Sequence, residues 1–187
     1  MVVRLARPDD GAAFASIYGP IVAETAISFE VDPPGADEMT ARVRGALAQH
    51  AWLAAEVDGA IAGYAYASQH RQRPAYRWGV DVAIYLDPRF RGRGLGSRVY
   101  RALLAVLHLQ GYQRAYAGIA LPNAASVAVH ESAGFRLVGV YQRTGFKFGR
   151  WHDVGWWDRI IRDDVDPREP APLSSVAPAA LAAALER

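Results

Sequence analysis

The chain reads Arg91-Gly92-Arg93-Gly94-Leu95-Gly96-Ser97 between a predicted strand, 78–86, and a predicted helix that runs to about residue 110. A loop of this kind leaves several backbone N–H groups free at the positive end of a helix dipole, which is a binding site for anions. The glycines let the backbone approach a phosphate because no side chain holds it away. The two arginines add positive charge. This stretch therefore predicts a cradle for a pyrophosphate.

Other phosphate-binding loops fit this stretch less well. A P-loop would need Lys and then Ser or Thr after its last glycine, and no lysine follows Gly96. A dinucleotide-binding fingerprint has the spacing Gly-x-Gly-x-x-Gly after an early strand, whereas the glycines here lie at every second position in mid-chain. A glycine-rich turn before an ordinary surface helix remains the simplest alternative, and the position between strand and helix argues against it.

The composition is that of one globular domain with a single core. The 187 residues are 51% hydrophobic and 21% charged, with a formal net charge of +2. The absence of cysteine excludes disulfides, a cysteine nucleophile and thiolate metal sites. The histidines show no metal-ligand spacing with carboxylates, so no metal is expected.

The charge pattern and the apolar pattern limit the possible partners. Nucleic-acid binding would need a larger basic excess and a recognisable reader motif, and neither is present. No apolar run reaches the roughly 18 residues of a membrane span, and the N-terminus lacks the apolar core of a signal peptide. We therefore expect no membrane association and a cytoplasmic location.

Periodicity predicts the element order β-α-α-β-β-β-α-β-α-β-β, an α/β (α+β) class with a mixed central sheet flanked by helices. Asp58-Gly59 predicts a two-residue hairpin turn between two strands. The last two strands are expected at 137–141 and 154–161. Residues 1–165 are assigned to the domain, and the segment 166–187, rich in proline and alanine, is expected to be a mobile tail.

These features resemble a known family. The sequence Arg-x-x-Gly-x-Gly from Arg91 to Gly96 is similar to the acetyl-CoA pyrophosphate loop of the GNAT N-acetyltransferase superfamily, whose fold the element order also resembles. A second block, Gly145-Phe146-Lys147-Phe148-Gly149-Arg150-Trp151-His152-Asp153-Val154-Gly155-Trp156, resembles the signature of phosphinothricin acetyltransferases and their methionine-sulfone and methionine-sulfoximine relatives. The likeness covers roughly residues 2–162 and implies the GNAT acyl-CoA N-acyltransferase fold.

The resemblance implies a set of cofactor contacts. Strand residues would bind the pantetheine arm of acetyl-CoA through backbone groups, the glycine loop would hold the pyrophosphate, and an asparagine would contact the cofactor. These positions are Ile84, Tyr85, Leu86, Arg91, Gly92, Arg93, Gly94, Leu95, Gly96, Ser97 and Asn123.

The resemblance also implies the catalytic groups. The amino group of the acceptor must lose a proton before it attacks a thioester, and a carboxylate can take that proton. The family uses a glutamate on the central strand, where this chain has Asp81, one methylene shorter. His130 stands where the superfamily often has a tyrosine that protonates the leaving thiolate, and it could instead belong to the base relay or simply cap a turn. A backbone N–H of a bulge near Ile84 or Tyr85 would stabilise the oxyanion.

The acceptor would be a small amino acid with a phosphinate, sulfone or sulfoximine group, whose oxygens suit arginine donors. The resemblance and the positions of these side chains indicate as substrate contacts Phe29, Glu30, Arg71, Arg73, Tyr76 and Lys147. The loop from Gln69 to Pro74 departs from the family segments associated with phosphinothricin.

The leading interpretation is an acetyl-CoA-dependent amino-acid N-acetyltransferase that works by direct transfer, since no cysteine is available for an acyl-enzyme. The alternatives are a protein N-terminal acetyltransferase and a non-catalytic acyl-CoA-binding module. Relatives are commonly homodimers, and Trp151, Trp156 and Trp157 would suit an interface.

Overall fold

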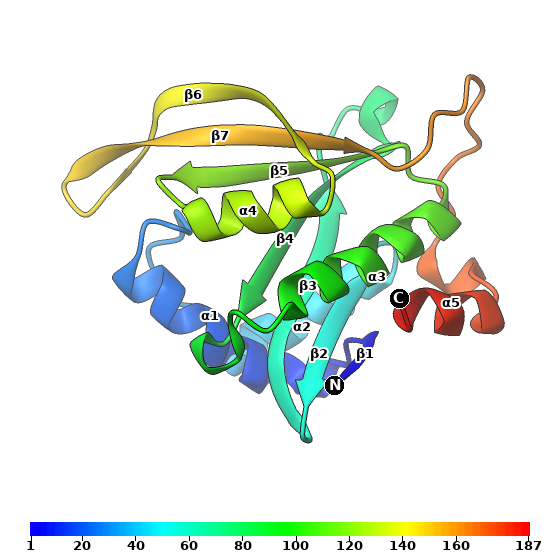
Figure 1. Ribbon diagram of the computed structural model, residues 1–187, viewed down its shortest axis with the longest axis horizontal. Coiled ribbons are helices and arrows are strands. Elements are labelled where there is room, and N and C mark those ends of the chain that lie inside the picture. The colour runs from blue at the N-terminus through cyan, green and yellow to red at the C-terminus, as the bar shows by residue number, and fades with distance from the viewer.

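A seven-stranded sheet in the order β1-β2-β3-β4-β5-β7-β6 forms the centre of the computed structural model, which describes residues 1–187 (Figure 1). The strands are β1 (Val2–Leu5), β2 (Trp52–Val57), β3 (Ala60–Gln69), β4 (Gly79–Leu86), β5 (Arg114–Leu121), β6 (Arg136–Lys147) and β7 (Arg150–Ile160). The helices are α1 (Gly11–Glu24), α2 (Ala36–Leu47), α3 (Leu95–Gln110), α4 (Ala124–Ser132) and α5 (Pro178–Leu185). This order confirms the mixed sheet and the element sequence expected from periodicity.

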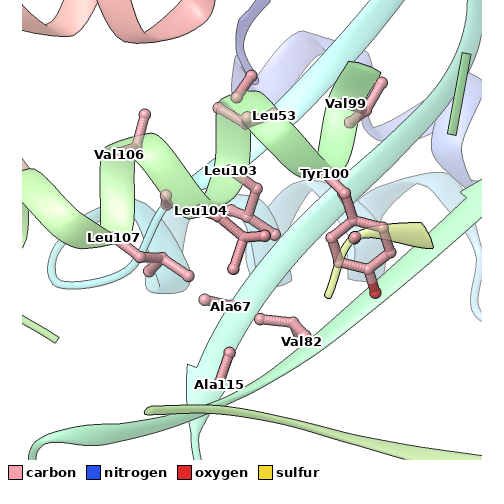
Figure 2. Close-up of a cluster of buried hydrophobic side chains, with 14 of the residues drawn as sticks. Leu53, Ala67, Val82, Val99, Tyr100, Leu103, Leu104, Val106, Leu107 and Ala115 are labelled. Atoms are coloured by element: carbon pink, nitrogen blue, oxygen red, sulfur yellow. The ribbon is translucent and has the colours of Figure 1, made fainter. Parts of the chain in front are cut away.

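Two hydrophobic clusters fix the helices to the two faces of the sheet. Helix α3 lies across one face and buries a row of aliphatic side chains, among them Val99, Leu103 and Leu107, against β2 to β5 (Figure 2). Helices α1 and α2 pack on the other face against the rings of Trp52 and Tyr64. No helix combines the length and apolar character needed to cross a membrane.

The first half of the sheet is antiparallel, as expected from its hairpins. β1 to β4 pair in sequence order, and the β2–β3 turn places Asp58 at φ 51° and Gly59 at φ 79°. Positive φ at both central residues is the geometry of a type I′ hairpin turn, which the Asp-Gly pair predicted. The sequence therefore set this turn locally.

The centre of the sheet opens between β4 and β5. These two strands pair in parallel only from Gly79 with Arg114 to Asp81 with Tyr116, and beyond that point β4 has no partner on this side. The expected bulge in β4 is absent, because the β3–β4 register is continuous from Gly63 with Leu86 to Gln69 with Val80. The divergence of two strands, rather than a bulge in one of them, frees the backbone groups at the centre of the sheet.

The C-terminal strands are much longer than expected. β6 and β7 form a twisted hairpin over residues 136–160 that extends past the end of β5 (Figure 1). Two register shifts, between Leu137 and Gly139 and between Tyr141 and Gly145, interrupt the pairing. These irregularities break the period-two apolar pattern. This explains why the predicted strands, 137–141 and 154–161, cover only part of β6 and β7.

The C-terminal segment differs from the expected mobile tail. Residues 178–185 form α5, which packs beside α3 at the opposite end from the glycine loop (Figure 1). Leu173 and Ala184 are buried in the main core. The run of alanines forms a helix because alanine has the highest helix propensity and its small side chain allows close packing. The segment contributes core residues despite its tail-like composition.

Candidate active site

The glycine loop presents a row of unpaired backbone donors. None of the N–H groups from Gly92 to Ser97 donates to a protein acceptor, and no side chain caps the start of α3. Gly94 has φ 73°, a left-handed conformation that turns the chain into the helix and suits glycine. The loop therefore has the geometry of an anion site at a helix N-terminus.

A groove of about 450 Å³ runs from this loop along β4. Ten of the eleven predicted cofactor contacts line it: Ile84, Tyr85, Leu86, Arg91, Gly92, Gly94, Leu95, Gly96, Ser97 and Asn123. The opposite wall comes from α4, including Ser126, Val129 and Ser132, and was not predicted from the sequence. The spacing of small residues on α4 was the available signal, but such spacing is equally typical of a packed helix.

The arginines around the loop differ in their availability. Arg91 lines the groove and donates to the carbonyl oxygen of Leu86 at 3.2–3.3 Å. Arg93 is the one predicted contact outside the groove, and its guanidinium lies 5.9 Å from the ring centre of Phe90. Arg89 is paired with Asp87. Only Arg91 is therefore placed to supply positive charge inside the groove.

A small cavity of about 50 Å³ fills the opening between β4 and β5. It is lined by Val82 to Tyr85 on one strand and by Gly118 to Ala120 on the other, and Asn123 and Ser126 connect it to the groove. The Asn123 side chain also accepts from the N–H of Ser126 at 3.1 Å and so caps α4. The groove thus leads from the anion site to the point where the sheet opens.

His130 also lines this cavity, but both of its ring nitrogens are engaged. Nδ1 donates to the carbonyl oxygen of Ser126 at 2.7 Å, and Nε2 accepts from the hydroxyl of Tyr100 at 2.7 Å. Burial lowers the pKa of His130, which keeps the ring neutral. In this tautomer Nε2 carries no proton to give to a thiolate, and the geometry fits the alternative of a helix histidine that caps a turn, here through the carbonyl oxygen of Ser126.

Asp81 lies at the last paired position of β4, where the strands diverge. Its side chain is 32% exposed, and its Oδ1 lies 2.6 Å from Nδ1 of His70. Burial raises the pKa of the Asp81 carboxyl, and the hydrogen bond from His70 opposes that shift. The predicted base is therefore accessible and in direct contact with a histidine.

Aromatic rings hold His70 in place. Its ring stacks on Tyr116 with 4.1 Å between ring centres, and the rings of Tyr76 and Trp156 meet it edge to face with 6.2 Å between ring centres. His70 was not among the site residues predicted from the sequence. No group of three or more His, Asp or Glu side chains is arranged for a metal ion. The signal that could have found it was the unusual 69–74 loop appearing together with the shortened Asp81.

The β3–β4 loop brings two of its predicted substrate contacts beside this pair. The Arg71 guanidinium lies 5.7 Å from the ring centre of Trp156, and Tyr76 is about half exposed beside His70. Arg73 is exposed and makes no hydrogen bond through its side chain. Arg71 and Tyr76 are therefore positioned together, whereas Arg73 lies at the solvent side of the same loop.

The other predicted substrate contacts hold the segment 25–30 against the β6–β7 hairpin. Lys147 is buried, and its Nζ donates to the carbonyl oxygens of Val22, Ser28 and Glu30 at 2.7–2.8 Å. All three of its protons are therefore used within the protein. The geometry gives Lys147 an anchoring position instead of a free contact to substrate.

Glu30 and Phe29 complete this junction. The Glu30 carboxylate accepts two hydrogen bonds from Arg42 at 2.8 Å each, and the pair links the segment to α2. The Phe29 ring lies where a side chain at position 145 would be, since a Cβ added there would be 2.2 Å from it. Gly145 is thus required by the close approach of the ring. Phe29 remains partly exposed beside this contact.

The tryptophans of the hairpin do not share one surface. Trp151 is half exposed, but Trp157 is buried in the core and donates to Glu131. The Trp156 ring lies over Gly118 on the face that carries His70. Trp157 therefore belongs to the core of its own chain, and among the three tryptophans expected at an interface Trp151 is the most exposed.

Comparison with known proteins places this geometry in a family. Residues 22–135 match the model of the acetyltransferase (GNAT) family. Phosphinothricin N-acetyltransferase of Streptomyces viridochromogenes is 34% identical over 93% of this chain and 95% of its own length. The L-methionine sulfoximine/L-methionine sulfone acetyltransferase of Salmonella typhimurium is 32% identical over 89% of this chain and 98% of its own.

A solved structure shows the same fold. The phosphinothricin acetyltransferase of Sinorhizobium meliloti, solved in complex with acetyl-CoA, superimposes with a TM-score of 0.85 at 33% identity, covering 94% of this chain and 95% of that one. The expectation drawn from the glycine loop and the hairpin block is therefore confirmed. The chain belongs to the acetyltransferase (GNAT) family and is an N-acetyltransferase similar to the phosphinothricin acetyltransferases.

Proposed function

We propose that the protein transfers the acetyl group of acetyl-CoA directly to the amino group of a small amino acid of the phosphinothricin or methionine sulfone type. The observation that carries this proposal is the groove, which runs from a row of free N–H groups to the opening of the sheet one residue beyond Asp81. A long cofactor with a phosphate end and a reactive end fits such a path.

The groove supports acetyl-CoA through its own donors. The N–H groups from Gly92 to Ser97 and the charge of Arg91 would hold the pyrophosphate. The unpaired backbone of β4 beyond Asp81 would bind the pantetheine arm as an added strand would be bound. An N–H of the same free stretch, near Ile84 or Tyr85, would donate to the oxyanion.

The reaction then requires one proton to leave the acceptor before attack. The ammonium group of the acceptor loses a proton to the base that contains Asp81, and the nitrogen lone pair forms a bond to the acetyl carbon. The C–S bond breaks, and the sulfur leaves with the electron pair as a thiolate. The role of His130 as the group that protonates this thiolate stays a prediction, and it would require a proton on Nε2 that the tautomer described above lacks.

The acceptor class follows from the loop beside Asp81. Arg71, with Arg73 further out, offers guanidinium donors for a carboxylate or for sulfonyl and phosphinyl oxygens. Tyr76 and Phe29 offer apolar contact for the methylene chain. The activities of the two relatives, on phosphinothricin and on methionine sulfoximine or sulfone, support this acceptor class.

Thiol release from acetyl-CoA tests the proposal, with phosphinothricin, methionine sulfone and a short peptide as separate acceptors. Turnover with either amino acid and not with the peptide is the expected result. Turnover only with the peptide would replace the amino-acid acceptor by a protein N-terminus. Tight binding of acetyl-CoA without release for any acceptor would favour a binding module.

We further propose that the protein is a homodimer, joined through the outer surface of the β6–β7 hairpin. β6 is an edge strand of the sheet, and exposed apolar side chains gather on this hairpin: Leu137, Val138, Val140, Tyr141, Phe146, Phe148 and Trp151. An exposed apolar edge strand favours association. Sedimentation that gives the mass of one chain would refute the dimer.

A further inference from the structure

We propose that His70 is a catalytic residue, and that it accepts the proton of the acceptor ammonium at Nε2 while Asp81 holds its Nδ1–H. This inference rests on the proposed function of the same site, and it changes the identity of the atom that takes the proton. The base is then a pair of side chains and not a lone carboxylate.

The hydrogen bond fixes the tautomer of His70. An ionised carboxylate can only accept, so the 2.6 Å contact between Oδ1 of Asp81 and Nδ1 of His70 places the proton on Nδ1. Nε2 is then the basic nitrogen. A carboxylate in this position also stabilises the imidazolium that forms when Nε2 takes a proton, as in other carboxylate-histidine pairs.

Nε2 is also free to meet a substrate. It makes no hydrogen bond within the protein, and it is not among the polar atoms that are sealed from solvent without a partner. His70 keeps 12% of its side chain exposed, and the stack on Tyr116 fixes the plane of the ring. A rigid ring with one open basic nitrogen meets the geometric needs of a general base.

The short side chain of Asp81 gives a second reason for a base at His70. Asp81 is one methylene shorter than the glutamate of the family that the chain resembles, so its carboxylate reaches less far from β4. The imidazole of His70 is hydrogen-bonded to that carboxylate, and it places a basic atom, Nε2, further from β4. The groups that face His70 are Asp81 from β4, Tyr116 from β5, Tyr76 from the short helix 74–76, Trp156 from β7 and Arg71 on its own loop. Among them Asp81 is the one carboxylate, and its contact is with Nδ1.

The acceptor nitrogen loses two protons in the proposed reaction, and the sulfur of the cofactor gains an electron pair. Nε2 takes one proton from the ammonium, which leaves a neutral amine. The lone pair of the amine forms the C–N bond, and the C–S bond breaks with the electron pair on sulfur. The second proton lost by the nitrogen passes to solvent or to the thiolate, and the imidazolium returns its proton to solvent.

The test compares kcat/KM for the amino acid across pH in the wild type, in His70→Gln and in His108→Gln, whose exposed side chain lies on α3 away from the site. His70→Gln is expected to lower kcat/KM by about 10²-fold or more, with acetyl-CoA affinity unchanged. The fall of its residual kcat/KM on acidification should begin at a lower pH than in the wild type, because a carboxyl group titrates below an imidazole. His108→Gln should behave as the wild type. A His70→Gln enzyme within about threefold of wild type, with the same fall of kcat/KM on acidification, would overturn the proposal.

A nitrogen NMR measurement keeps the two proposals separable. In the wild type, Nδ1 of His70 should carry a strongly hydrogen-bonded proton. The NMR signal of that N–H group should be lost in Asp81→Asn. If the wild type acetylates the peptide instead of the amino acids, the acceptor assignment falls and the His70 comparison is made on the peptide. If no acceptor is acetylated, an Nδ1 signal that is unchanged in Asp81→Asn overturns the pair, and a lost signal supports it.

Discussion

The two ends of the groove are built in different ways. The anion end consists of main-chain N–H groups from one continuous loop, Gly92 to Ser97. The proposed acceptor end consists of side chains from three separate segments: His70 and Arg71 before β4, Asp81 in it, and Trp156 in β7. A backbone site depends little on which residues surround it, whereas a side-chain site changes with each of them.

This difference explains how one cofactor can be kept while acceptors vary. The loop needs glycines and a helix start, which local sequence supplies. The acceptor end needs the β6–β7 hairpin and the segment 25–30 to meet correctly, and the buried Lys147 holds them together. Substitutions at the two ends should therefore separate acetyl-CoA affinity from acceptor turnover.

The largest effect is expected at the acceptor end, from Asp81→Asn. The amide cannot stabilise a protonated base, so kcat/KM for the acceptor should fall by about 10²- to 10⁴-fold. Calorimetric titration should show acetyl-CoA affinity unchanged, because no groove contact is removed. Full turnover in this variant would mean that the carboxylate has no role in the reaction.

Lys147→Met should show how far the acceptor end depends on its anchor. Three buried carbonyl oxygens would lose their donor, and the free energy of unfolding should fall by about 3 kcal/mol. Urea denaturation measures this, and KM for the acceptor should rise while acetyl-CoA affinity holds. Arg150→Met, at an exposed position of the same hairpin, is the control and should leave both nearly unchanged.

Gly94→Ala tests the anion end. A side chain at φ 73° costs on the order of 1 kcal/mol in backbone strain, and the distorted loop should weaken acetyl-CoA binding about tenfold. Gly59→Ala is matched to it, with φ 79° and open space around the added atom, but lies in the β2–β3 turn. We expect the two variants to lose the same free energy of unfolding, and only Gly94→Ala to bind acetyl-CoA more weakly. If both variants bind acetyl-CoA with the same affinity, the loop does not bind the cofactor.

The smallest effect is expected from Glu30→Gln. The Arg42 hydrogen bonds hold the pKa of Glu30 below its ordinary value of 4.5. A carboxyl whose pKa is lowered on folding stabilises the fold above its unfolded pKa, and this contribution is lost as pH falls through the folded pKa. The variant should therefore be less stable than wild type near pH 7, by less than about 1 kcal/mol. Thermal denaturation below pH 4.5 should show the difference shrinking; a constant difference would contradict the ion pair.

Much of the fold was predictable from short-range signals. The Asp58-Gly59 turn, the alternation of β4 and the glycine loop before α3 each depend on a few neighbouring residues, and each was found in the structure. The β6–β7 hairpin was only partly predictable, because its register shifts disturb the apolar period. Helix α5 was missed, since a run of alanines and prolines resembles a linker until a core is available to bury it.

The candidate site divides in the same way. Ten of the eleven expected cofactor contacts line the groove, because most of them lie in two adjacent stretches of chain. Lys147, His130 and Glu30 were predicted as site residues, yet their polar atoms are occupied by Ser28, Tyr100, Arg42 and other protein groups. Sequence alone cannot show whether a polar side chain is already paired.

By itself, the sequence determined the glycine loop, the central strand with Asp81 and the family, because backbone geometry and alternation are local properties. Only the tertiary structure decided that β4 and β5 diverge beyond Asp81, and that His70, eleven positions earlier in the chain, bonds to it. The physical reason is that a hydrogen bond between side chains depends on strand pairing and ring packing from β3 to β7. Those contacts exist only once the whole sheet has formed.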